Sequence, residues 1–229
     1  NQQLFRDTKW GADVTDPTKI REKFKNQFNI QVTGVTKTAP AWKIKYANET
    51  GKALEQVYAA VPSLKDRART LRKKSKVTLN ITNDMGTTHS MSNGVLAYYT
   101  PGKNSITTLR RSMERTTPAL DIGSHWNHNV AVDFASTMRH EYGHMVQDQL
   151  LTGYRAAKVK ELYSTIGPDR IAREISVYAA TNSDEMFAEI FSAWTSPLYG
   201  VAPGNISMSH RILPEWAERL MIDVLGDRG

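Results

Sequence analysis

The chain has 229 residues, a formal net charge of +7 and an apolar fraction of 40%. A chain of this length can bury a substantial core, as one large domain or as two closely packed lobes. It contains no cysteine, which excludes disulfides, thiolate zinc ligands and cysteine nucleophiles. A transition-metal site would therefore need histidine and carboxylate ligands. No apolar run approaches the length of about 18 residues that a membrane-spanning helix requires, so we expect no membrane span.

The N-terminal third of the chain predicts mainly helices. Apolar residues recur every four positions from Thr18 to Phe28, which predicts an amphipathic helix beginning just after Pro17. The alternation in Ile30–Val35 predicts a short strand. Apolar residues at helical spacing between Asn48 and Leu64 predict a second helix. The chain begins without methionine or an apolar signal segment, which suggests a processed chain or a domain of a longer protein.

The strongest run of charge is Lys65–Lys76. One interpretation is a patch that contacts phosphate groups of nucleic acid or another acidic partner, and the alternative is a solvated helix end. We favour the solvated surface, because no aromatic residue lies between the cations and no nucleic-acid-binding motif accompanies them.

Three strands are predicted next. Lys76–Thr82 has an apolar residue at every second position and predicts a strand with one buried face. Gly94–Thr100 and Ser105–Leu109 flank the turn sequence Pro101–Asn104, which predicts a hairpin. The following loop, Thr116–Asn129, contains two histidines. His125 and His128 could belong to an extra metal site or to a substrate cleft, but we favour solvated histidines because other segments supply three ligands.

The motif H-E-x-x-H follows, in His140-Glu141-Tyr142-Gly143-His144, within a helix expected over Ala131–Leu150. Residues four apart on a helix lie one turn apart on the same face, so His140 and His144 can bind one metal ion. Glu141 flanks that face and can accept a proton from a water molecule. Gly143 lowers helix propensity, which predicts close approach by a neighbouring backbone or by substrate.

A second pair of acidic residues lies on a later helix. Ile166–Asp169 separates a polar segment from Arg170–Tyr178, for which we expect a short helix. The next helix begins near Asn182 or Ser183 and carries Glu185 and Glu189 four residues apart. Glu185 could be a third metal ligand. Alternatively it could cap the helix, since Asn182 and Glu185 have capping-box spacing.

Together the two helices resemble the gluzincin metallopeptidases, whose third zinc ligand is a glutamate beyond the H-E-x-x-H helix. The pattern Y-x-x-x-N-x-x-E-x-F-A-E, from Tyr178 to Glu189, is similar to the catalytic domain of anthrax lethal factor and to zincin domains of phage head-morphogenesis (minor capsid) proteins and bacterial toxins. The resemblance implies three zinc ligands, which are His140, His144 and Glu185. It implies Glu141 as general base and Glu189 as the partner that orients His140. It also implies that Tyr178 stabilises the oxyanion, although a tyrosine there could instead be a packing residue.

The resemblance implies an α+β, zincin-like fold, in which a small twisted sheet is flanked by an active-site helix and a second ligand-bearing helix. An edge strand, placed at Val95–Tyr99, would pair with extended substrate. We expect a mainly helical N-terminal segment over 1–75 and the zincin catalytic core over 76–229, or one continuous domain. A C-terminal helix is expected over Ile212–Leu225.

The function implied is a zinc-dependent metalloendopeptidase acting on a protein or peptide, which could include its own polypeptide or virion proteins. Two alternatives stay open. The chain could be a virion or minor capsid component that retains the domain for assembly, or a secreted toxin or effector domain. Either setting favours a virion-associated or secreted protein over a housekeeping cytoplasmic one.

Overall fold

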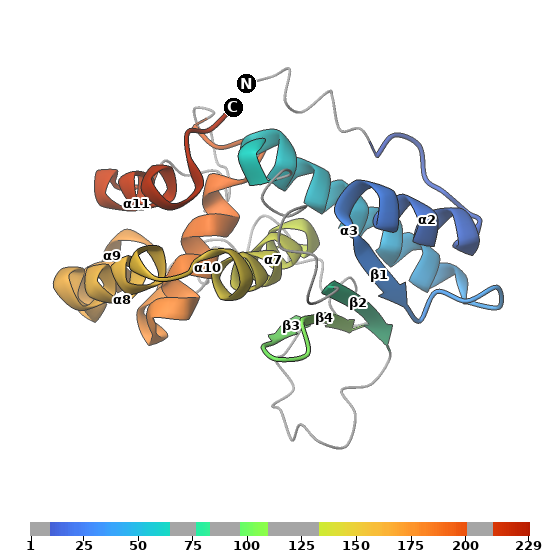
Figure 1. The fold of residues 1–229 in the computed structure, drawn as a ribbon, viewed down its shortest axis with the longest axis horizontal. Coiled ribbons are helices and arrows are strands. Elements are labelled where there is room, and N and C mark those ends of the chain that lie inside the picture. Colours follow the sequence, from blue (N-terminus) through green and yellow to red (C-terminus); the bar gives the residue numbers. More distant parts are fainter. Residues whose placement is uncertain (1–9, 65–76, 83–96, 110–132, 201–212) are drawn as a thin grey trace.

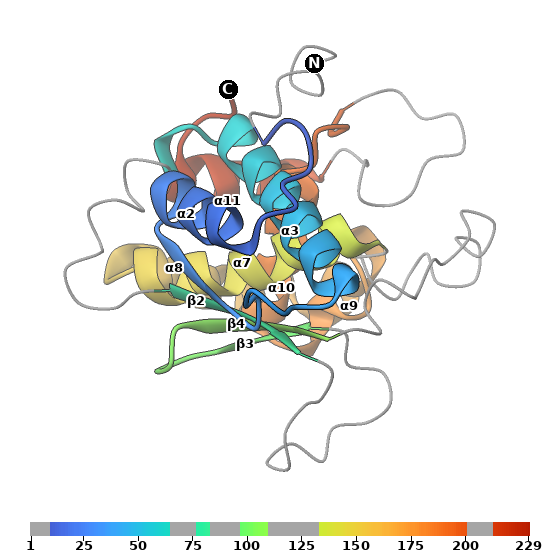
Figure 2. The same ribbon diagram turned by 90° about the vertical axis from the view of Figure 1, so that its right-hand side faces the viewer.

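The computed structural model describes residues 10–64, 77–82, 97–109, 133–200 and 213–229. Its elements are α2 (Pro17–Phe28), β1 (Ile30–Thr33), α3 (Ala41–Ala60), β2 (Val77–Thr82), β3 (Ala97–Thr100), β4 (Ser105–Leu109), α7 (Phe134–Leu150), α8 (Tyr154–Ile166), α9 (Pro168–Glu174), the 3-10 turn η3 (Ala179–Thr181), α10 (Ser183–Trp194) and α11 (Glu215–Leu225). Figure 1 shows α7 near the centre of the molecule. Figure 2 shows the helices gathered on one face of a small sheet. The α+β class expected from the sequence is confirmed.

Within the described residues, four strands form one sheet in the order β1-β2-β4-β3. β1, β2 and β4 run parallel, whereas β3 pairs antiparallel with β4. The predicted hairpin is therefore confirmed, and Asn104 and Gly102 adopt positive φ in its turn. Because β3 is the last strand in the order, Ala97–Tyr99 lies at an edge, as expected for this segment. Positions 95 and 96 lie outside the described residues.

Two helices differ from the sequence-based prediction. α3 begins at Ala41, whereas apolar spacing predicted a start at Asn48. The alternation of Trp42, Ile44 and Tyr46 with lysines masked the helical pattern, yet Tyr46 is buried and the other two pack partly against the core. The polar segment before Ile166, for which no structure was predicted, is helix α8; only Val159 is fully buried in it.

Other boundaries agree more closely. α2 begins at Pro17, one residue before the predicted start, and α10 begins at Ser183, within the predicted range. α7 begins at Phe134, where Asp133 forms a capping box with Ser136, and not at Ala131. The short helix expected over Arg170–Tyr178 is α9, which begins earlier and ends earlier. The C-terminal helix begins at Glu215, after Pro214, rather than at Ile212.

The structure does not test the two segments for which the sequence left both a functional and a solvated interpretation. The basic run Lys65–Lys76 and the loop Thr116–Asn129, with His125 and His128, lie outside the described residues. Within the part of the chain that is described, no helix combines the length and the apolar character needed to cross a membrane.

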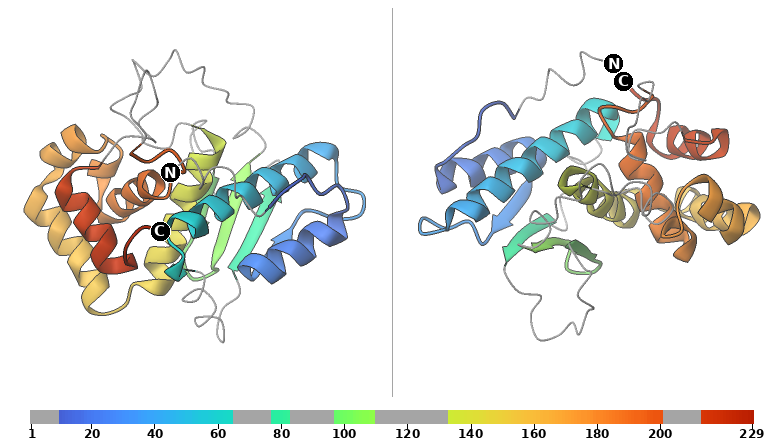
Figure 3. Two further views of the ribbon diagram at one scale, coloured as in Figure 1. Left: turned by 90° about the horizontal axis from the view of Figure 1, so that it is seen from above. Right: turned by 180° about the vertical axis from the view of Figure 1, so that it is seen from behind.

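The contact between α7 and α10 brings the two motif helices together. Figure 3 shows α8–α11 gathered on one side of α7, with α2 and α3 on the other. A Cβ atom at Gly143 would lie 3.0 Å from a ring carbon of Phe191 and 3.2 Å from the Cα atom of Ala188. The predicted close approach is therefore made by the backbone of α10. Ser192 Oγ also donates to the backbone oxygen of Ser136 at 2.7 Å.

We expect Gly143→Ala to lower thermal stability. Alanine would favour helix α7 by about 1 kcal/mol, but overpacking against α10 typically costs about 1–3 kcal/mol. Circular dichroism melts should therefore show a lower Tm. In a Phe191→Leu background, which removes the nearest ring, the same change should cost less. A rise in Tm on the wild-type background would show that α10 can move away from α7 without penalty.

Candidate metal centre

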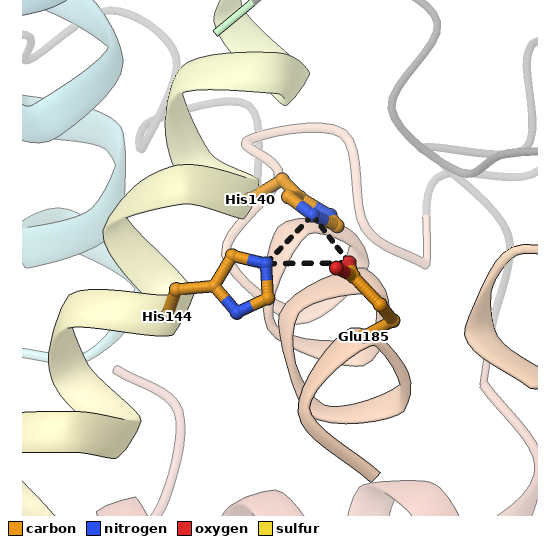
Figure 4. Close-up of side chains that lie close together, drawn as sticks. All are labelled: His140, His144 and Glu185. Carbon is orange, nitrogen blue, oxygen red and sulfur yellow. Dashed lines mark hydrogen bonds and ion pairs between the residues drawn. The ribbon is translucent and has the colours of Figure 1, made fainter. Parts of the chain in front are cut away.

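Helices α7 and α10 bring three donor atoms together (Figure 4). His140 and His144 lie one turn apart on α7, and their Nε2 atoms are 3.1 Å apart. Glu185, in the first turn of α10, places Oε2 3.0 Å from His140 Nε2 and 3.2 Å from His144 Nε2. His140 is buried, and the other two side chains are partly exposed. This group could hold a metal ion.

The spacing of the three atoms fits a metal site. Tetrahedral zinc with bonds of about 2.0–2.1 Å keeps its ligand atoms roughly 3.3 Å apart, and the three separations here are 3.0, 3.1 and 3.2 Å. The buried Oε2 atom of Glu185 accepts no well-aligned hydrogen bond, although both imidazole nitrogens are within 3.2 Å. The two imidazole nitrogens lie within hydrogen-bond distance of each other. The buried Glu185 oxygen between them has no aligned partner, and a shared cation would explain its place there.

The Glu185 side chain is not placed as a helix cap, which was the alternative to a metal ligand. Asn182 caps α10, because its side chain accepts hydrogen bonds from the backbone N–H groups of Asp184 and Glu185, each at 2.9 Å. The Glu185 carboxylate instead lies beside the two histidines. The cap therefore orients the first turn of α10 and leaves Glu185 available as a ligand.

Glu189 lies behind His140, on the side away from the three donor atoms. Its Oε1 is 2.9 Å from His140 Nδ1, and the carboxylate is completely buried. A carboxylate at Nδ1 holds the proton on that nitrogen and leaves the lone pair of Nε2 for a metal. The structure thus places Glu189 next to the histidine that the resemblance indicated.

The two carboxylates favour positive charge at His140. Burial by itself would lower the pKa of His140, but the adjacent carboxylates of Glu185 and Glu189 outweigh burial and raise the pKa to about 10. Burial would raise the pKa of Glu185, but His140 and His144 hold it well below its ordinary range. The site therefore attracts a cation, and a proton competes with a metal ion for it.

Glu141 is also buried, with 7% of its surface exposed. Burial raises the pKa of its carboxyl group, against the opposing effect of the two histidines and of a hydrogen bond from the Tyr99 backbone. A carboxylate whose pKa is raised towards neutrality is a better proton acceptor than an exposed one. Glu141 is thus chemically distinct from Glu185, although both belong to one cluster.

Tyr178 lies at the rim of the same site. Its ring centre is 5.8 Å from that of His140, and 37% of its surface is exposed. Burial, followed by the charges of Glu185 and Glu141, raises the pKa of its hydroxyl group. The phenol therefore stays protonated near pH 7 and can donate a hydrogen bond.

Two polar residues next to the site were not identified from the sequence. Ser176 Oγ donates to Glu189 Oε2 at 2.9 Å. Tyr99, on β3, donates its hydroxyl hydrogen to Asp148 Oδ2 on α7 at 2.7 Å. Neither residue belongs to a motif, and each pair is joined only by the tertiary fold, so spacing along the chain gave no signal.

No protein-family model, curated protein or solved structure matches the chain.

We expect the protein to bind one zinc ion per chain in a competition assay with a chromophoric chelator. Glu185→Ala removes a donor and should weaken binding more than about 100-fold, whereas Glu189→Ala should cost about 10–100-fold, as losses of outer partners do. Glu161→Ala changes an exposed residue of α8 and serves as the control. Full zinc binding by Glu185→Ala would show that the ligand is assigned wrongly.

Proposed function

We propose that this chain is a zinc-dependent metallopeptidase of the gluzincin type, with a zincin-like fold. The observation that carries the proposal is the triangle of donor atoms from His140, His144 and Glu185, with Glu141 buried on α7 close enough to interact electrostatically with all three. Structural zinc sites use four protein ligands, whereas catalytic sites use three and leave one position for water. The described residues supply three donors to the site, and three donors favour catalysis.

The donor set favours zinc among the common metals. Imidazole suits zinc, copper, iron and nickel, whereas calcium and magnesium prefer oxygen ligands. Two histidines and one carboxylate are a known ligand set of catalytic zinc. A zinc ion held here would polarise a water molecule and lower its pKa to about 7.

Glu141 is the proposed general base. It would take a proton from the attacking water and return it to the leaving amine, and its raised pKa suits both steps. Tyr178, protonated and partly exposed beside His140, would donate a hydrogen bond to the carbonyl oxygen as negative charge develops on it.

Strand β3 is the proposed site of substrate pairing. It is at an edge of the sheet, packs beside α7, and its residue Tyr99 bonds through the backbone to Glu141. An extended peptide added along Ala97–Tyr99 would place its backbone next to the base. The substrate class is accordingly a protein or peptide in extended conformation.

We expect Glu141→Gln to keep the fold and the zinc but to lower kcat/KM on a cleaved fluorogenic peptide by about 100- to 10,000-fold, the usual contribution of a general base. Glu161→Gln is the matched control on an exposed site. Equal turnover by Glu141→Gln and wild type would remove Glu141 as base. Wild-type protein that binds zinc but cleaves nothing in a peptide library would favour an assembly role, such as that of a minor capsid component.

For Tyr178→Phe we expect unchanged zinc content and stability but a kcat about 100- to 1,000-fold lower, which is the effect of deleting one oxyanion donor. KM should change little, because this bond forms mainly in the transition state. Tyr154→Phe, at a tyrosine with 76% of its surface exposed, is the control. A Tyr178→Phe variant that is less stable yet fully active per folded molecule would identify Tyr178 as a packing residue.

A further inference from the structure

Ser176 is a buried serine between α9 and η3, and its hydroxyl group makes two hydrogen bonds. It has no exposed surface. Its Oγ accepts a hydrogen bond from the Ala179 N–H at 3.0 Å and donates one to Glu189 Oε2 at 2.9 Å. An amide N–H can only donate and a carboxylate can only accept, so the direction of both bonds is fixed.

The chain of bonds continues to the metal centre. The second oxygen of Glu189, Oε1, is 2.9 Å from Nδ1 of His140. With its other oxygen held by Ser176, the carboxylate has one orientation in which it can accept the Nδ1 proton. Ser176 is therefore linked through Glu189 to the His140 ring.

The same hydroxyl group shapes the turn that carries Tyr178. The bond from the Ala179 N–H closes the chain around Val177 and Tyr178, next to a second bond from the Ala180 N–H to the Ser176 backbone oxygen at 3.3 Å. On this turn, the Tyr178 ring lies 5.8 Å from the His140 ring. One side chain thus connects the ring of a candidate ligand with the candidate oxyanion donor.

We propose that Ser176 is a positioning residue that fixes both the orientation of His140 towards the metal and the place of Tyr178 at the site. The inference rests on the proposed metal centre and extends it beyond the residues of the motif. It requires that removal of the hydroxyl group weakens metal binding and loosens the turn together.

The test uses Ser176→Ala, with Ser164→Ala as the matched control. Ser164 is an exposed serine of α8 whose hydroxyl donates to the Lys160 backbone oxygen. Zinc affinity is measured by chelator competition, and deuterium exchange is followed on peptides covering 177–182. We expect Ser176→Ala to weaken zinc binding about 10-fold, at the lower end for outer partners, and to speed exchange at the Ala179 amide. Ser176→Thr keeps the hydroxyl group and should retain more of both properties.

A double-mutant cycle with Glu189→Gln separates positioning from general stability. If Ser176 acts through Glu189, Ser176→Ala should lower zinc affinity on the wild-type background but add little on the Glu189→Gln background. If Ser176→Ala does not fold, Glu189→Gln serves alone, and it should also speed exchange of the turn. Equal losses on both backgrounds, or unchanged affinity and exchange in Ser176→Ala, would overturn the proposal.

The readouts distinguish this inference from the proposed function. Wild-type protein that binds zinc without cleaving peptides refutes the peptidase activity alone, because affinity and exchange still test Ser176. Wild-type protein that binds no zinc refutes the metal centre and the inference with it.

Discussion

The close packing of α10 on α7 is the constraint on which the candidate metal centre depends. Three donor atoms from two helices lie between 3.0 and 3.2 Å apart, which requires the helices to be held at a fixed separation. Gly143, directly before His144 on α7, lets the backbone of α10 approach at Ala188. Arg139 Nε, buried beside His140, donates to the Ser192 backbone oxygen at 3.1 Å and so joins the helices further along. Helix packing therefore sets the separation of the three donor atoms.

Electrostatics divide the acidic residues of the cluster into different roles. Glu185 lies beside two histidines, which outweigh the effect of burial, hold its pKa low and keep it ionised, as its proposed role as a ligand requires. Glu141 is more deeply buried, and that burial raises its pKa in spite of the same histidines. Carboxyl groups whose environments push their pKa values apart are the usual basis of acid and base assignments. The assignment of Glu141 as base and Glu185 as ligand thus has a physical reason beyond motif position.

Much of this arrangement could be predicted from the sequence because it depends on short-range spacing. A four-residue separation places His140 and His144 one turn apart on α7. Two strand-forming segments on either side of a turn sequence predicted the β3–β4 hairpin. The first part of α3 was missed because its lysines and aromatics alternate like a strand, and tertiary burial of Tyr46 overrides that pattern. Ser176 could not be found at all, because its bond to Glu189 joins residues 13 apart through the fold.

A buried network of histidines and glutamates can have one of two roles. It can stabilise the fold as a structural ion-pair network, or it can form a metal centre. A purely structural pair would align its hydrogen bonds, since unsatisfied buried polar atoms cost about 1–3 kcal/mol each. Glu185 Oε2 leaves that potential unused beside two imidazole nitrogens, while Glu189 and Ser176 form well-aligned bonds behind His140. The groups behind His140 are thus hydrogen-bonded, whereas Glu185 Oε2 has no aligned partner although it faces both imidazole nitrogens. That difference favours a metal centre over a structural ion-pair network, and the protonated phenol of Tyr178 at its rim favours one that acts on a substrate.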